Sequence, residues 1–183
     1  MNIKVFLSAI SMFFVVSSCS VTKIETTKYI PQEDTINNVL VIYNCPEGIS
    51  DFVSGMSFQL SEMFASKGIK SNFLIMPDHK SGLSLMSPKE IEKEKIELIY
   101  KKKLTQKVDY LFYINTKSEL AYSSLDSKIY YWEFEAKLFD QDSDESFFDA
   151  DFSVSVGNLG IDSNTANGVR RKLEKTLVEN GIM

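Results

Sequence analysis

Val39-Leu40-Val41-Ile42-Tyr43 is a continuous run of large apolar residues, most of them β-branched. A strand with one wet face alternates apolar and polar residues, whereas a strand covered on both faces does not. The run therefore predicts a central strand of a sheet that has protein layers on both sides.

The segment after this run carries a helix and a second covered strand. A turn is expected at Asn44–Gly48, a helix begins near Ser50, and Lys67-Gly68 ends it with a left-handed residue. Phe73–Met76 is again continuously apolar, so strand, helix and strand predict a parallel crossover. The helix is expected to bury the stripe Phe52, Val53, Met56, Leu60, Met63 and Phe64.

A further helix and a third covered strand are expected next. Ser87, Pro88 and Glu90 have the types and spacing of a capping box, and the helix runs to about Lys107. Lys101–Lys103 fall in its last turns, where they complement the helix dipole, and Asp109–Ile114 forms the strand.

The apolar pattern then changes to strict alternation. Tyr130–Leu138 and Phe148–Val156 each place apolar residues on one face only, which predicts two half-wet antiparallel strands. Two registers keep the apolar faces together. We expect the one that sets Lys137 opposite Asp151, because the other sets Glu135 opposite Asp151.

A last helix is expected from about Asn164 to Glu179, ended by Asn180-Gly181. Its inward row comprises Ala166, Val169, Leu173 and Leu177. The predicted fold class is α/β with a mixed sheet, in a single domain at residues 38–183. The predicted order is strand, helix, strand, helix, strand, strand, strand, helix.

The first residues have the layout of a secretory signal. MNIKVFLSAISMFFVVSSCS places Lys4 before an apolar run and small residues before Cys19. The run is too short to span a bilayer, so residues 1–18 are expected to be a removable signal peptide.

The ending Val16-Ser17-Ser18-Cys19 resembles a bacterial lipobox. The resemblance implies cleavage before Cys19 and acyl chains on its sulfur, with membrane lipid as the partner of those chains. Two or three chains make a lasting anchor, whereas one binds only marginally. Residues 20–37 are polar, threonine-rich and broken by Pro31, so residues 19–37 are expected to be the lipidated cysteine and a flexible tether. As a coil the tether spans roughly 25 Å.

The net charge argues against nucleic-acid binding, and the cysteine content argues against an intrachain disulfide. The 183 residues carry a formal net charge of −5, and an acidic, exported chain is a poor nucleic-acid binder. If Cys19 is acylated, Cys45 is the one remaining thiol, so no intrachain disulfide is expected.

Asp109-Tyr110-Leu111-Phe112 and the stretch from Phe134 to Asp140, within the predicted order of elements, carry a second resemblance. The chain is similar to the small α/β domains of periplasmic lipoproteins that activate peptidoglycan synthases or assist secretion-channel assembly. The threonine-glycine turn of those domains is replaced here by Asp142–Glu145. The resemblance implies a non-enzymatic protein that binds another envelope protein.

Cys45 and His79 are the residues that could indicate catalysis. Cys45 lies between a strand end and a helix start, where thiol pKa values are lowered and α/β sheets place ligands. However, His79 is the only histidine in the chain, and no motif places it beside Cys45. We expect a buried or bystander thiol and a loop histidine, and a thiol enzyme is the hypothesis set against this.

Asp140, Asp142, Asp144 and Asp151 have the spacing of oxygen ligands in a calcium loop. The glycine that such a loop needs is replaced by Glu145, and the flanks are predicted strands rather than helices. A solvated hairpin turn is therefore expected, with a calcium site as the alternative.

Two clusters of charged residues need no function beyond exposure to water. Glu133, Glu135, Asp149 and Asp151 share the outer face of the alternating strands, but no pocket sets their pKa values apart as paired-carboxylate catalysis needs. Lys101–Lys103 could contact anionic headgroups, although a solvated helix end explains them as well.

These observations predict a lipid-anchored envelope protein without catalytic residues, metal ligands or cofactors. We expect it to act as an interaction or assembly accessory in the periplasm or at the cell surface, with the outer membrane favoured. A small-ligand or calcium-binding lipoprotein is the alternative.

Overall fold

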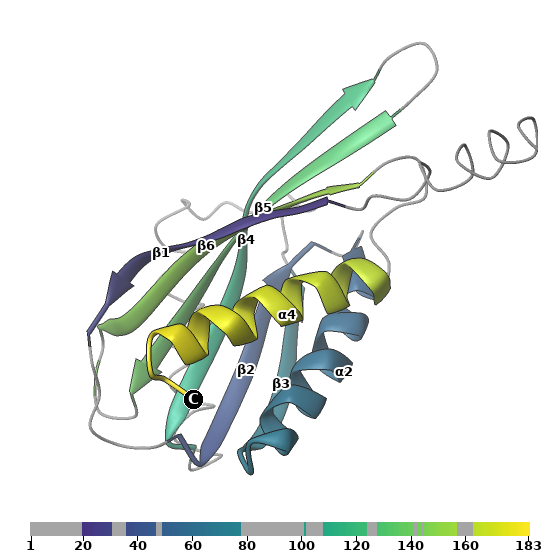
Figure 1. Ribbon diagram of the computed structural model, residues 1–183. Helices are drawn as coiled ribbons and strands as arrows, with labels where there is room; N and C mark the ends of the chain where they lie inside the picture. The colour runs from purple at the N-terminus through teal and green to yellow at the C-terminus, as the bar shows by residue number, and fades with distance from the viewer. Residues whose placement is uncertain are drawn as a thin grey trace, which may run out of the picture.

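The computed structural model describes residues 20–30, 36–46, 49–77, 101, 108–123, 128–140, 143, 145–156 and 163–183. Its described elements form one six-stranded sheet and two long helices on one face of it (Figure 1). The elements are β1 Ser20–Tyr29, β2 Asn38–Cys45, α2 Ser50–Ser66, β3 Lys70–Pro77, β4 Tyr110–Ser123, β5 Lys128–Asp140, β6 Ser146–Val156 and α4 Ser163–Glu179.

The sheet is mixed, with the strand order β1-β6-β5-β4-β2-β3. β3, β2 and β4 are parallel, and β4, β5, β6 and β1 are antiparallel. The α/β class is therefore confirmed, together with the change from covered parallel strands to an antiparallel meander. β2 lies between two strands, and the run from Val39 to Tyr43 is fully buried, as the continuous apolar run predicts.

α2 and α4 cover one face of the sheet and enclose the main core. Both predicted stripes are buried as expected. Each helix also ends as predicted, because Gly68 and Gly181 take φ values of 74° and 69° that an L side chain rarely adopts. The amides of Ile69 and Ile182 then bond back to the carbonyls of Phe64 and Leu177 (both 2.9 Å).

β3 differs from the prediction because it is an edge strand. The apolar run Phe73–Met76 predicts cover on both faces, yet Ile75 is 52% exposed and only Met76 of this run is buried. An edge strand has a neighbour on one side only, so apolar residues there are covered less completely than in β2.

The segment 20–29 is not a flexible tether but strand β1, which pairs antiparallel with β6 along its length. That part of the tether prediction is wrong. Ile24 and Tyr29 pack against the main core, while Glu25, Thr26 and Thr27 are exposed. Register shifts between Val21 and Ile24 and between Thr26 and Lys28 interrupt the alternation that would have indicated a strand.

The register between β5 and β6 also differs from the prediction. Glu135 stands opposite Asp151, and Lys137 stands opposite Asp149, so the expected Lys137–Asp151 pairing is wrong. The apolar faces still coincide, because Phe134 faces Phe152 and their rings stack at 5.0 Å. The like charges are tolerated because Lys117, from the next strand, reaches Asp151 (2.9 Å).

The second face of the sheet carries a smaller apolar cluster over β2, β3 and β4. It consists of Leu40, Ile42, Met76, Val108 and Leu111. The predicted helix from Ser87 to Lys107 lies outside the described residues, except for Lys101, which is helical and exposed.

Candidate functional site

A straight row of polar residues crosses five strands on the face of the sheet opposite α2 and α4. Backbone pairing places Glu25 of β1, Asp151 of β6, Glu135 of β5, Asn115 of β4 and Asn44 of β2 side by side. At the usual strand spacing the row is about 19 Å long. We call this row and its hydrogen-bonded neighbours, namely Lys117, Ser118, Tyr131, Glu133, Lys137 and Ser153, the polar sheet face.

Hydrogen bonds link three members of the row, on β2, β4 and β5. Asn44 Nδ2 donates to Asn115 Oδ1 (2.6 Å), and Asn115 Nδ2 donates to Glu135 Oε1 (2.9 Å). The other oxygen of Glu135 pairs with Lys137 Nζ (3.0 Å). Both carboxylate oxygens of Glu135 therefore have a donor, and the side chain is held in one orientation.

Lys117 is brought to this face by a bulge. The pairing of β4 with β5 shifts between Thr116 and Ser118, so Lys117 has no direct partner in the ladder and its side chain reaches across β5. Its Nζ lies 2.9 Å from Asp151 Oδ2. The pKa of Lys117 is raised above 10.5, first by this hydrogen bond and then by the charges of Asp151, Glu135 and Glu133.

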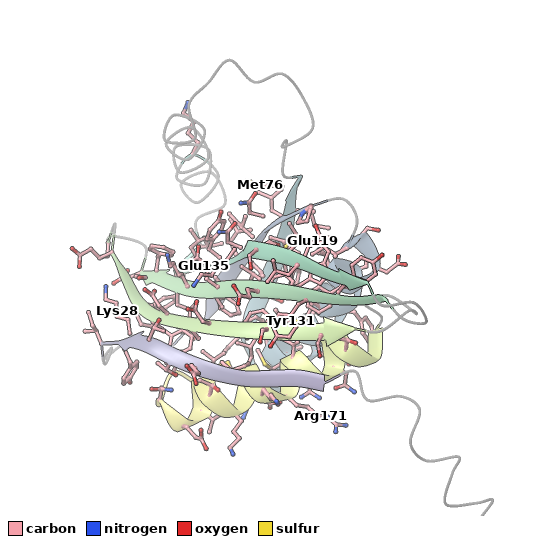
Figure 2. The ribbon with its side chains drawn as sticks, turned by 90° about the horizontal axis from the view of Figure 1, so that it is seen from above. Lys28, Met76, Glu119, Tyr131, Glu135 and Arg171 are labelled. Atoms are coloured by element: carbon pink, nitrogen blue, oxygen red, sulfur yellow. The ribbon has the colours of Figure 1, made fainter. Side chains whose placement is uncertain are left out.

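The neighbouring polar groups are paired as well. Ser118 Oγ donates to Glu133 Oε2 (2.7 Å), and the hydroxyls of Tyr131 and Ser153 lie 3.4 Å apart. Figure 2 shows Glu135 and Tyr131 at separate positions along the sheet. Each of Glu133, Glu135 and Asp151 thus accepts a bond from a donor of its own, an arrangement suited to recognition rather than to proton transfer.

The polar sheet face is accessible to solvent except at Asn44, which is buried. The side chains of Lys117 and Asp151 are each 42% exposed, and those of Lys137 and Glu135 are 32% and 22% exposed. No described helix lies over it, since α2 and α4 pack on the other side. The face can therefore bind a partner that offers both donors and acceptors.

The sequence predicts only part of this face. The shared outer position of Glu133, Glu135, Asp149 and Asp151 is confirmed by the pairing of β5 with β6. Asn44, Asn115 and Lys117 were missed. Because alternate residues of a strand share one face of the sheet, Asn44 and Asn115 could have been assigned to this face from their positions in β2 and β4. No sequence signal marks the bulge that turns Lys117 outward.

The other residues singled out in the sequence lie elsewhere. Cys45 is 2% exposed and belongs to the main core, which confirms a buried thiol. Cys19 and His79 lie outside the described residues, so lipidation and the role of the histidine stay predictions. In the described ranges, no group of histidine, cysteine, aspartate and glutamate could hold a metal ion.

The calcium-loop alternative fails at its last ligand. Asp151 stands opposite Glu135, five positions along β5 from Asp140, which is a separation of about 17 Å. Oxygen ligands of one calcium ion lie within 2.3–2.6 Å of it, so these two carboxylates cannot share an ion. Asp142 and Asp144 lie outside the described residues.

Tyr43 places a hydroxyl without a described partner in the main core. Tyr43 on β2 is fully buried, and its hydroxyl makes no hydrogen bond. The nearby Ser57 hydroxyl donates to the carbonyl of Val53 instead (2.9 Å). Burial raises the pKa of Tyr43 above 10.0.

The described helices include none that is both long and apolar enough to cross a bilayer. No protein-family model matches the sequence, and no curated protein matches it.

Several solved structures are similar in fold. A PelC dodecamer from Paraburkholderia phytofirmans is 11% identical, with a TM-score of 0.52 over 90% of this chain and 100% of PelC. Lipoprotein GNA1162 from Neisseria meningitidis is 13% identical, with a TM-score of 0.46 over 78% and 99% of the two chains. A minor lipoprotein from Acinetobacter baumannii is 3% identical, with a TM-score of 0.41 over 80% and 95%. The PelC match, with a TM-score above 0.5, shows a shared fold.

Proposed function

We propose that this protein is a non-enzymatic lipoprotein of the bacterial cell envelope, anchored by acyl chains on Cys19, that binds another envelope protein through the polar sheet face. The observation that carries the binding role is the row of amides and carboxylates across five strands, which is accessible on β1, β6, β5 and β4 and rests on the buried Asn44 of β2. Anchoring rests on the signal sequence and its resemblance to a lipobox.

The arrangement of charges favours binding over catalysis. A catalytic acid and base need environments that push their pKa values apart. Here Glu135 and Asp151 are neighbours on adjacent strands, and each forms an ion pair with a partly exposed lysine. A partner can instead replace solvent around a prearranged set of donors and acceptors, which gives specificity more than affinity.

The anchor is tested by mass spectrometry of the protein produced in a bacterium with its leader. The expected product begins at Cys19 and carries acyl chains, and Cys19→Ser should carry none. A product that keeps its first residues and has no lipid would end the proposal of an anchor.

The binding surface is tested by photo-crosslinking in intact cells. A crosslinking residue at Ser153 should capture one envelope protein, and the matched position Lys175, which is 74% exposed on α4, should not. The additional substitution Lys117→Glu should abolish capture at Ser153. Equal capture at both positions, or capture that survives Lys117→Glu, would contradict a role for the polar sheet face.

A second copy of this chain is one partner to test, since PelC, which shares the fold, forms a dodecamer. Native mass spectrometry of the purified protein distinguishes self-assembly from binding to a different protein.

A further inference from the structure

The first residue of β1 lies in the same row as the exposed part of a projecting hairpin. Ser20 pairs with Ser155, Ser155 with Tyr131, and Tyr131 with Leu120. At the usual strand spacing Ser20 is about 15 Å from Leu120. Cys19, one residue before Ser20, therefore connects to the sheet at the level of Leu120.

The hairpin of β4 and β5 extends beyond that row. Backbone pairing continues through three more pairs, Ala121–Tyr130, Tyr122–Ile129 and Ser123–Lys128, which adds about 10 Å. β6 ends its pairing with β5 at Tyr130, so the last two pairs, Tyr122–Ile129 and Ser123–Lys128, continue past β6 as a two-stranded ribbon. Figure 1 shows the hairpin rising past both helices, at the end of the molecule where β1 begins. We call Leu120–Ser123 and Lys128–Tyr131, the part of the hairpin from the Leu120 row outward, the β4–β5 arm.

The amino-acid composition of the arm is unfavourable for a ribbon that is exposed only to water. Leu120 is 47% exposed and Tyr131 is half-buried, whereas Tyr130 packs against the main core. The sequence of the two strands also contains Ala121, Tyr122 and Ile129. A two-stranded ribbon is at best marginally stable in water. Tyrosine and leucine side chains are, in contrast, well suited to the boundary between lipid headgroups and acyl chains.

We infer that the β4–β5 arm is a membrane-contacting surface, which lies in the lipid interface when Cys19 is acylated. This inference rests on the proposed anchor. Because β1 begins at Ser20, no flexible spacer separates the acyl chains from the sheet, and the row containing Leu120 is held at the membrane surface. The arm reaches about 10 Å past that row, comparable to the 5–10 Å to which interfacial segments are buried.

The experiment measures the depth of Leu120 relative to a matched position. Val178, near the end of α4, is 44% exposed, compared with 47% for Leu120. It lies close to the end of β1 that is distant from Cys19, since the neighbouring Gly181 approaches the Tyr29 hydroxyl. Leu120→Cys and Val178→Cys each add one accessible thiol, because Cys45 is buried and Cys19 is expected to be acylated.

The full chain is produced with its leader, labelled with a fluorescent maleimide and placed in vesicles of phosphatidylethanolamine and phosphatidylglycerol. Some of these lipids carry a nitroxide quencher at a shallow position of the acyl chain. Quenching is expected to be several-fold stronger at position 120 than at position 178. Mass spectrometry of the same samples reports acylation of Cys19, and thermal unfolding confirms that both variants are folded.

The outcomes separate the arm from the anchor. Acylated protein in which both positions are quenched equally weakly would overturn membrane contact by the arm and leave the anchor intact. Absence of acyl chains would overturn both proposals. A probe at position 120 that becomes shielded as protein concentration rises, without vesicles, would show that a second copy covers the arm and would also overturn the inference.

Discussion

Tyr43 places a hydroxyl in the main core where no described group bonds to it. A buried hydroxyl without a partner costs free energy relative to an apolar group of the same shape. Tyr43→Phe is therefore expected to leave the free energy of unfolding unchanged or raise it by up to about 1 kcal/mol. Urea unfolding at pH 7 measures this change.

The pKa of Tyr43 also predicts how stability depends on pH. The pKa is raised in the folded protein, so the unfolded chain loses this proton first, near pH 10. The stabilising contribution is complete below that pH, and about 1.4 kcal/mol is lost for each pH unit above it.

Tyr43→Phe should therefore lose less stability between pH 9 and pH 11 than the parent protein loses, as judged by urea unfolding. An identical loss in both proteins would contradict the burial argument. Tyr43→Ala serves as the control, since it opens a cavity and should cost about 3–5 kcal/mol.

Lys117 is expected to hold the polar sheet face together. Lys117→Met leaves Glu135 and Asp151 opposite each other without the cation that now bonds Asp151. The expected loss is about 0.5–1 kcal/mol of unfolding free energy, because the pair is partly exposed.

Urea unfolding checks the Lys117 prediction, with Lys175→Met as the matched control. Lys175 pairs with Glu179 at 3.6 Å and is 74% exposed, so its loss should cost little. Adding Asp151→Asn to Lys117→Met should restore most of the stability. Failure of this rescue would show that like-charge repulsion is not the cause.

At the residue scale, the sequence indicates which side chains are buried better than which polar groups meet. The periodicity of apolar residues predicts the buried stripes of both helices and the residues of β5 and β6 that face the core. It does so because burial of apolar side chains dominates the free energy of folding. The register of these two strands does not follow from pairwise charges within them, because the deciding cation, Lys117, comes from a third strand.

Among the elements, β1 is the one whose nature matters most for function. Hydrogen exchange should show slow exchange in the amides of Ser20–Tyr29 that bond to β6, at rates similar to those of β6 itself. A flexible tether would exchange at the rate of an unstructured peptide. Mass spectrometry of peptides from this segment, after exchange in native buffer, distinguishes the two.

The elements that could be predicted are those with an uninterrupted pattern. α2, α4 and β2 can be predicted because an apolar pattern continues through each of them without a break. The glycines that end the two helices, Gly68 and Gly181, are also recognisable from the adjacent sequence. β1 was missed because two register shifts break its alternation, leaving a polar stretch that has the composition of a linker. A strand of this kind is recognisable only from the exposed edge of β6 that it completes.

On the scale of the whole molecule, the proposed anchor at Cys19 would hold the domain close to the membrane, because β1 begins at the next residue. Inserting a Gly/Ser linker of about 20 residues directly after Ser20 restores a reach of roughly 25 Å. The Leu120→Cys probe in vesicles should then be quenched no more than the Val178→Cys probe, while Cys19 stays acylated. Fluorescence and mass spectrometry measure the two quantities. Unchanged quenching would show that the arm binds lipid without help from the anchor position.

The fold class could be predicted from the sequence, because the change from covered to alternating strands marks where parallel pairing ends. The polar sheet face could be predicted only as a set of outward carboxylates. Its hydrogen bonds depend on residues from four strands that lie far apart in the chain. Such a surface exists only once the sheet has formed, so no local motif announces it.

The antiparallel pairing of β1 with β6 determines how the domain would respond to mechanical load. If the protein is anchored at Cys19 as proposed, traction from the membrane would enter at Ser20 and run along β1, at right angles to the hydrogen bonds that join it to β6. With the opposing load at the C-terminus, which lies near Tyr29, these bonds are loaded in shear and yield together, whereas a pull from Ile30 would open them one pair at a time. In optical tweezers, a handle at position 19 should therefore require a higher rupture force than a handle at position 30. Such a domain would stay folded while it connects a moving partner to the bilayer.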